Sequence, residues 1–165
     1  MNREPRALNA EAASRHFQSK RYEAYSVFVS HNLKAPHRDL VEEIFGQLEQ
    51  RQVKCFEYQE VNRPGIDWNK ELKTQLAATT HFVALFGDGY ETSEACTSEL
   101  ETVLARGDAV RILPYLLEGR TVPHVKLRGR HHPLLHDPDP RANARVVVEH
   151  VMELLVKSLA EQDTP

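Results

Sequence analysis

Residues 81–104 read HFVALFGDGYETSEACTSELETVL. They begin with a continuous apolar run, Phe82–Phe86, which ends at Gly87 and is typical of a strand buried on both faces. A loop with small polar residues follows, and Thr92 or Ser93 can cap the helix after it. The apolar side chains of that helix are spaced to share one face: Cys96, Leu100, Val103 and Leu104. The stretch therefore predicts a buried strand, a loop and an amphipathic helix in succession, which is the repeating unit of an α/β fold.

Glu99 is the residue of chemical interest in this stretch. Successive helical residues are rotated by about 100°, so Glu99 lies at the edge of the apolar face, one position before Leu100. A carboxylate at that edge can be partly shielded from water while it faces the loop that leaves the strand. Most glutamates on helices are simply solvated, so this position alone does not specify a site.

The composition is that of one soluble globular domain. A chain of 165 residues with 41% hydrophobic and 27% charged residues can bury a proper core. The net charge of −3 gives no electrostatic reason to expect binding to nucleic acid or to an anionic membrane. No apolar run approaches the roughly 20 residues that cross a bilayer, and the N-terminal sequence has no apolar signal segment. Cys55 and Cys96 lie in apolar segments and are expected to be free, buried thiols, which suits a cytoplasmic protein.

The rest of the sequence alternates strands and helices. The predicted elements are strands at 25–30, 53–58 and 110–117, helices at 39–50, 68–76 and 142–159, and an irregular segment, 118–140, with a short fifth strand. Pro114 lacks a backbone N–H, which predicts a bulge or a sheet edge within its strand. Alternation of this kind predicts a parallel sheet with helices on both faces. The expected domain is 25–160, after a helical or flexible lead-in at 1–24 and before a tail at 161–165.

Polar and aromatic residues follow the strands at the edge where a ligand is expected. Ligands of parallel α/β sheets bind beyond the carboxyl ends of the strands. The first strand ends in Ser30, His31 and Asn32. Tyr90 lies in the loop after the third strand, and Glu99 is on the helix that comes next. Tyr90 can stack on a base, whereas the three residues at the end of the first strand can bind phosphate or ribose.

Taken together, these segments resemble Toll/interleukin-1 receptor (TIR) domains, most closely the bacterial members. The matching motifs are Val27-Phe28-Val29-Ser30-His31, Arg63-Pro64-Gly65, Tyr90-Xaa-Xaa-Ser93, Cys96-Xaa-Xaa-Glu99-Leu100 and Ile112-Leu113-Pro114-Tyr115-Leu116-Leu117. They occur in the family's order and spacing over residues 25–159. The resemblance implies a flavodoxin-like α/β fold, in which a five-stranded parallel sheet has helices on both faces.

The resemblance also implies that the protein cleaves NAD, as many bacterial and plant TIR domains and some animal ones do. The family's glutamate maps onto Glu99 as the catalytic residue, and Ser30, His31, Asn32, Tyr90 and Trp68 are the expected substrate-binding residues. The loop at 59–67 corresponds to one that the family uses for gating and self-association. NAD is the substrate, and no cofactor or metal is expected. The expected setting is bacterial immune defence, including defence against viruses, with oligomerisation through TIR–TIR contacts and a fused or partner sensor domain.

The chemistry of NAD cleavage suits a carboxylate at position 99. Nicotinamide leaves a cationic ring as a neutral molecule, so no strong acid is needed, and the transition state is a ribosyl oxocarbenium ion. Glu99 can hold the ribose hydroxyls and stabilise that cation. Attack by water gives ADP-ribose, and attack by another nucleophile on the same sugar gives a cyclic ADP-ribose isomer.

One departure from the family concerns an aromatic residue. The family usually has a tryptophan immediately before the cysteine of the Cys-Xaa-Xaa-Glu-Leu motif, and this chain has Ala95 there. Tyr90, Trp68 and Phe56 are the aromatic residues that can take its place. The replacement of the tryptophan by Ala95 is expected to affect the rate of NAD cleavage and the identity of the product more than the fold.

Several other functions remain open at this point. Many TIR domains are non-catalytic scaffolds that act through TIR–TIR contacts, which is the main alternative. A nucleoside deoxyribosyltransferase-like enzyme has a related sheet and also uses a glutamate, although the Pro64-Gly65 loop and the Cys-Xaa-Xaa-Glu-Leu motif favour a TIR domain. Asp88 is placed like the phosphate acceptor of a receiver domain, but the acidic pair that receivers need after the first strand is missing. Prolines interrupt the histidine-rich segment 131–137, so it lacks the spacing of a metal site, and Cys96 is interpreted as a core residue.

Overall fold

The computed structural model describes residues 21–34, 37–57, 68–117 and 124–162. Its elements are β1 (Ser26–Ser30), α2 (Arg38–Gln50), β2 (Lys54–Phe56), α3 (Trp68–Ala78), β3 (His81–Phe86), α4 (Glu94–Leu104), η2 (Gly107–Ala109), β4 (Arg111–Leu117), η3 (Val125–Leu127), β5 (Leu134–Leu135) and α5 (Pro140–Gln162). The five strands form one parallel sheet in the order β2-β1-β3-β4-β5. This arrangement confirms the predicted flavodoxin-like α/β fold.

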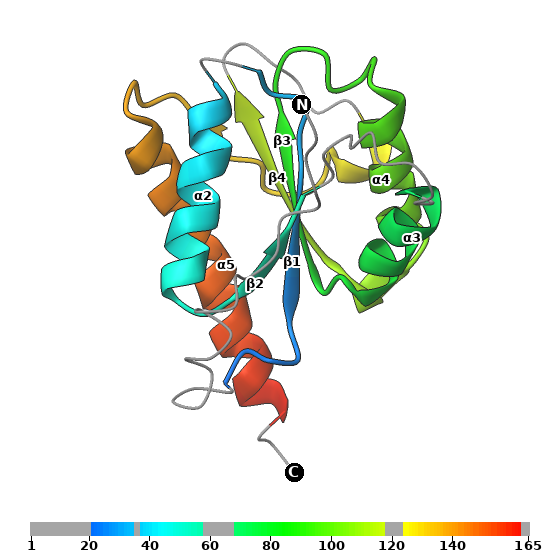
Figure 1. Ribbon diagram of the computed structural model, residues 1–165, viewed down its shortest axis with the longest axis vertical. Coiled ribbons are helices and arrows are strands. Elements are labelled where there is room, and N and C mark those ends of the chain that lie inside the picture. Colours follow the sequence, from blue (N-terminus) through cyan, green and yellow to red (C-terminus); the bar gives the residue numbers. More distant parts are fainter. Residues whose placement is uncertain (1–20, 35–36, 58–67, 118–123, 163–165) are drawn as a thin grey trace.

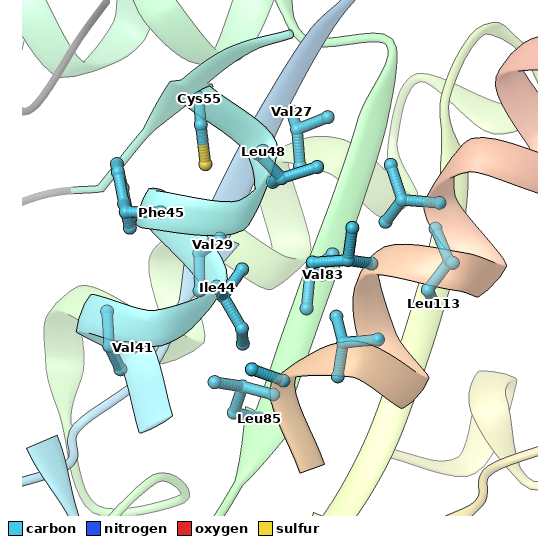
Figure 2. Close-up of a cluster of buried hydrophobic side chains, with 14 of the residues drawn as sticks. Val27, Val29, Val41, Ile44, Phe45, Leu48, Cys55, Val83, Leu85 and Leu113 are labelled. Carbon is cyan, nitrogen blue, oxygen red and sulfur yellow. The ribbon is translucent and has the colours of Figure 1, made fainter. Parts of the chain in front are cut away.

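Helices cover both faces of the sheet (Figure 1). α2 and α5 pack together on one face, and α3 and α4 lie on the other. Side chains along a strand alternate between the faces, so Val27 and Val29 join the core under α2 and α5, whereas Phe28 joins the core under α3 and α4. Figure 2 shows the first of these cores, where residues of α2 meet those of β1 and β3. The same alternation decides which side chains can meet at the strand ends.

The predicted elements are present, with shifts of a few residues at their ends. The face that α2 buries is the predicted one: Leu40, Val41, Ile44, Phe45 and Leu48. Of the two predicted caps of α4, Ser93 is the one used, since its Oγ accepts a hydrogen bond from the Cys96 N–H at 3.2 Å. β2 is shorter than predicted, and α5 extends through Glu161 and Gln162, beyond its predicted end.

Pro114 lies in a strand that has no bulge, but its nitrogen faces a side of β4 that no described strand covers, so of the two predicted alternatives the edge position is confirmed. β4 pairs with β3 in unbroken register and with β5 on its other side. The Leu116 N–H donates to the Pro133 carbonyl on the β5 side, and backbone groups two residues apart point the same way, so the Pro114 nitrogen also faces that side. Because β5 pairs only with Leu116 and Leu117, no described strand residue needs a donor from Pro114. A proline is tolerated there for that reason.

Some predictions lie outside the described residues. They are the structure of the lead-in at 1–20, the loop at 59–67 with its Arg63-Pro64-Gly65 turn, Asp67 as a helix cap, and the last residues, 163–165. Among the helices that are described, none combines the length and apolarity needed to cross a bilayer.

Candidate active site

The side chains of Ser30, the last residue of β1, and of His31, the next residue, lie on opposite faces of the sheet. Ser30 pairs in register with Ala84, whose side chain belongs to the core under α3 and α4. Ser30 therefore points toward α4, and because side chains alternate, His31 points toward α2. Consecutive in sequence, the two residues enter two separate polar clusters.

The first cluster, the Glu99 cluster, consists of Ser30, Tyr90 and Glu99. Ser30 Oγ lies 2.7 Å from Glu99 Oε1 and 2.8 Å from the Tyr90 hydroxyl. Only 1% of Ser30, 1% of Tyr90 and 3% of Glu99 is exposed. Glu99 was predicted to be partly shielded at the edge of α4, but it is almost fully buried, with Ser30 of β1 hydrogen-bonded to it and Tyr90, from the loop after β3, hydrogen-bonded to Ser30. Three of the predicted site residues thus meet.

Asn32, another predicted site residue, braces the turn that carries Tyr90. Its Nδ2 donates to the Gly89 carbonyl at 3.2 Å. Gly89 has a φ of +79°, and a Cβ there would lie 2.8 Å from Asn32 Nδ2, so the turn requires glycine. The Tyr90 ring also stands edge-on to Phe86, with 4.7 Å between the ring centroids. These contacts set the direction in which the Tyr90 hydroxyl points.

The second cluster, the Glu57 cluster, consists of His31, Arg38 and Glu57. Arg38 donates two hydrogen bonds to Glu57, from Nη2 to Oε1 at 2.7 Å and from Nη1 to Oε2 at 2.9 Å. This bidentate geometry is the strongest that such a pair can adopt. The Leu33 N–H donates to His31 Nδ1, so in the neutral ring Nε2 carries the proton and donates it to Glu57 Oε2 at 2.7 Å. Glu57 is completely buried.

Sequence analysis missed Arg38 and Glu57, although one signal pointed to Glu57. Val53 and Cys55 were predicted to be packing residues, and both are buried. Glu57 is the next residue on the same side of the chain, so a continued strand turns its carboxylate inward, where a charge needs a partner. Nothing in the sequence identifies that partner, because Arg38 lies 19 positions away on another element.

The two buried carboxyls have opposite electrostatic settings. Burial and, to a smaller extent, the charge of Glu57 raise the pKa of Glu99, the Ser30 hydrogen bond lowers it, and the net result is a pKa of about 8. Burial would also raise the pKa of Glu57, but the hydrogen bonds and charges of His31 and Arg38 outweigh it and hold that pKa below its usual value. Glu57 is therefore ionised at neutral pH, whereas Glu99 holds a proton until a positive partner or a higher pH removes it.

Glu99→Gln is expected to stabilise the fold, and more so as the pH rises. The folded pKa of about 8 lies above the ordinary value of 4.5, so ionisation of Glu99 opposes folding. This cost is absent below about pH 4.5, grows up to about pH 8 and then levels off. The gain in free energy of unfolding should reach a few kcal/mol, since one pKa unit corresponds to about 1.4 kcal/mol. Urea unfolding of both proteins at pH 5 and pH 8 measures it.

The matched control is Glu94→Gln, which removes the same charge from an exposed position in the first turn of the same helix. The free energy of unfolding of Glu94→Gln should differ little from that of the wild type, and the difference should not increase between pH 5 and pH 8. A Glu99→Gln gain that is equal at the two pH values would contradict the assignment of a raised pKa to Glu99.

The other residues that the sequence analysis singled out belong to neither polar cluster. Cys96 is buried, and burial raises the pKa of its thiol to about 11, so it is a poor nucleophile. Phe56 is half-buried against the core under α3 and α4. Ala95 is half-buried near the start of α4. The side chain of Trp68 lies outside the described part of the structure, so its predicted role stays a prediction.

A shallow hollow of about 510 Å³ lies away from both clusters. Its lining consists of Arg51 and residues of α5: Glu149, Met152, Glu153, Val156, Lys157 and Ala160. None of the candidate site residues lines it. Within the described ranges, no group of three or more His, Cys, Asp or Glu side chains is placed to hold a metal ion.

Comparisons with known proteins agree with this fold. The family model for the TIR domain matches residues 27–147. The TIR domain of the Toll-related receptor TRR-2 from Hydra magnipapillata aligns with a TM-score of 0.55 and 13% identity, over 79% of this chain and 98% of that chain. The TIR domains of the activated Roq1 resistosome, which directly recognises the pathogen effector XopQ, align with a TM-score of 0.52 and 19% identity, over 76% of this chain and 71% of that chain. At such identities the likeness shows a shared fold. A search of curated proteins found no match.

Proposed function

The chain belongs to the TIR domain family, and from that premise we propose that it is an NAD glycohydrolase. The reaction breaks the bond between nicotinamide and ribose and releases nicotinamide with ADP-ribose or a cyclic ADP-ribose isomer. Glu99 is the catalytic residue. The observation that carries the proposal is the position of the buried Glu99 carboxyl at the carboxyl edge of the parallel sheet. There it accepts a 2.7 Å hydrogen bond from Ser30 at the end of β1.

The carboxyl has one oxygen held by the protein and one left for a substrate. Ser30 occupies Oε1. Within the described residues, no hydrogen bond involves Oε2. Glu99 Oε2 is the atom that a ribose hydroxyl of NAD would approach.

The reaction needs the charge of Glu99 more than a proton from it. The electron pair of the C1′–N bond moves onto the nicotinamide ring, which leaves as a neutral molecule, and the positive charge moves onto the ribose as an oxocarbenium ion. Ionised Glu99 stabilises that charge. Water then adds to C1′ and loses a proton, which gives ADP-ribose; attack by another nucleophile of the substrate closes the cyclic product.

The raised pKa of Glu99 fits a substrate that carries a positive charge. The free carboxyl, with its pKa near 8, is mostly protonated at neutral pH. The nicotinamide ring of bound NAD is a cation, and a cation nearby favours the ionised carboxylate. Substrate binding therefore releases the proton and creates the catalytic charge in a site with little water, where a charge acts most strongly.

A scaffold that acts only through contacts between TIR domains is the second candidate. The observation in its favour is the burial of Glu99 itself, because a hydrogen-bonded carboxyl can join β1 to α4 without any chemistry. Self-association through TIR–TIR contacts is part of both candidate functions.

For the enzyme, we propose that oligomerisation and a fused or partner sensor domain activate it, in the cytoplasm of a bacterium under viral attack.

The test is NAD consumption by the wild-type protein at low and high concentration, with the products identified by mass spectrometry. Nicotinamide release is expected, at a rate per protein molecule that rises with protein concentration, because association favours the active assembly. The ribosyl product distinguishes hydrolysis from cyclisation. NAD that stays intact at every concentration of a folded protein would favour the scaffold.

A further inference from the structure

We propose that Tyr90 and Ser30 are positioning residues that act in sequence on Glu99, and not substrate-binding residues. In this arrangement the Tyr90 hydroxyl orients Ser30, and Ser30 fixes the plane of the Glu99 carboxyl so that Oε2 faces the substrate. The inference deepens the proposed function and rests on it for its catalytic part.

The polar groups of Tyr90 and Ser30 are engaged by other residues of the protein. Tyr90 is 1% exposed, and its hydroxyl is hydrogen-bonded to Ser30, which in turn is hydrogen-bonded to Glu99. Phe86 covers an edge of that ring, and Asn32 holds the carbonyl of Gly89, the residue before Tyr90. The ring is locked on a rigid turn, which suits a residue that supports another one.

The number of protons in the cluster determines the direction of its hydrogen bonds. An ionised carboxylate can only accept, so Ser30 must donate its one proton to Glu99 Oε1. The Ser30 oxygen is then an acceptor, and the Tyr90 hydroxyl, 2.8 Å away, must be the donor to it. The chain Tyr90 to Ser30 to Glu99 therefore has one arrangement that satisfies every proton when Glu99 is ionised.

This arrangement stabilises the charged form of Glu99 against its burial. The Ser30 hydrogen bond lowers the pKa of Glu99, which burial raises. A donor behind Ser30 polarises its hydroxyl and strengthens the bond to the carboxylate. Removal of either hydroxyl should therefore make Glu99 harder to ionise, and Ser30 should matter more because it makes the direct contact.

The experiment compares Ser30→Ala and Tyr90→Phe with the wild type by two readouts. The first is the titration of the Glu99 side chain, followed by ¹³C NMR and assigned by its loss in Glu99→Gln. The second is the pH profile of kcat/KM for NAD, whose acid limb reports the free enzyme. The midpoint should rise by about one pH unit in Ser30→Ala and by less in Tyr90→Phe, and kcat near pH 7 should fall about tenfold or more, with KM changed less.

Two matched controls are built into the same fold. Ser26→Ala removes a buried serine hydroxyl from the same strand and face, one that donates to the Ala78 carbonyl at 2.9 Å. Tyr115→Phe removes a buried tyrosine hydroxyl from the opposite face, where it bonds His150 Nδ1 at 2.9 Å. Each control should lower the free energy of unfolding about as much as the matching test variant does. The titration midpoint of Glu99 should stay at its wild-type value in both controls.

The outcomes separate this inference from the proposed function. Midpoints that rise in both variants support positioning even if the protein leaves NAD intact, in which case only the enzymatic proposal fails. Midpoints that coincide with the wild type, or that move equally in the two controls, overturn the inference even if NAD is cleaved. If Ser30→Ala does not fold, Tyr90→Phe decides the question, since it deletes one oxygen atom and keeps the ring.

Discussion

Glu99→Gln is expected to lower kcat/KM for NAD cleavage by about a thousandfold, the scale on which one charged or hydrogen-bonding group acts on a developing transition-state charge. Glutamine keeps the volume of the side chain and an oxygen that can accept the Ser30 hydrogen bond. It lacks the negative charge that the ribosyl cation needs. Nicotinamide release, measured by chromatography at pH 8 where wild-type Glu99 is substantially ionised, gives the ratio directly.

The fold of this variant serves as an internal control. Because the buried charge is removed, Glu99→Gln should be at least as stable as the wild type at pH 8, so lost turnover cannot be assigned to unfolding. Glu94→Gln, on the exposed side of the same helix, should retain wild-type turnover. Normal turnover by a folded Glu99→Gln protein would move the catalytic role to another residue, even if the NAD-cleaving activity were real.

Arg38→Ala is expected to destabilise the protein by about 3 kcal/mol at pH 8, because it leaves the buried charge of Glu57 without its arginine partner. Arg38 supplies both hydrogen bonds of a bidentate pair, and the substitution removes both from the carboxylate. The cost should be smaller at pH 5. Without Arg38 the pKa of Glu57 rises, so the carboxyl takes up a proton more readily as the pH falls and the cost of its buried charge decreases.

Urea unfolding at the two pH values measures this cost, and an exposed pair provides the control. Arg141 Nε lies 3.8 Å from Asp139 Oδ1, with 72% and 52% of the two side chains exposed. Arg141→Ala should therefore change the free energy of unfolding by less than about 1 kcal/mol. Similar small losses for Arg38→Ala and Arg141→Ala would show that the Glu57 cluster is not a buried ion pair in solution. A double-mutant cycle of Arg38→Ala with Glu57→Gln then isolates their coupling.

The order of the elements and the faces that they bury followed from local rules. The apolar run Phe82–Phe86 predicted β3, and the periodic apolar residues of α2 predicted its buried face residue by residue. Ser93 was one of two predicted caps for α4. These features depend on neighbours a few positions apart, because strands repeat every two residues and helices every 3.6. The same rules brought Glu99, Ser30 and Tyr90 to one edge of the sheet.

The limits of local rules appear at Pro114 and Glu57. The proline was predicted to mark a bulge or an edge, and it lies at an edge position within β4 because the neighbouring strand β5 is too short to reach it. Glu57 was not predicted as a site residue, because Arg38, the residue that balances its charge, is on α2. In both cases the decisive fact is the length or position of another element, which the local pattern does not contain.

The sequence by itself determined the fold class, the core faces and the choice of Glu99 as the candidate catalytic residue. Only the tertiary structure decided how deeply Glu99 is buried, which of its oxygens is held, and that Ser30 and His31 belong to different clusters. The contacts responsible join residues 69 and 60 positions apart, Ser30 with Glu99 and Ser30 with Tyr90. Burial and pKa are properties of the atoms packed around a group, and those atoms are assembled only when distant parts of the chain come together.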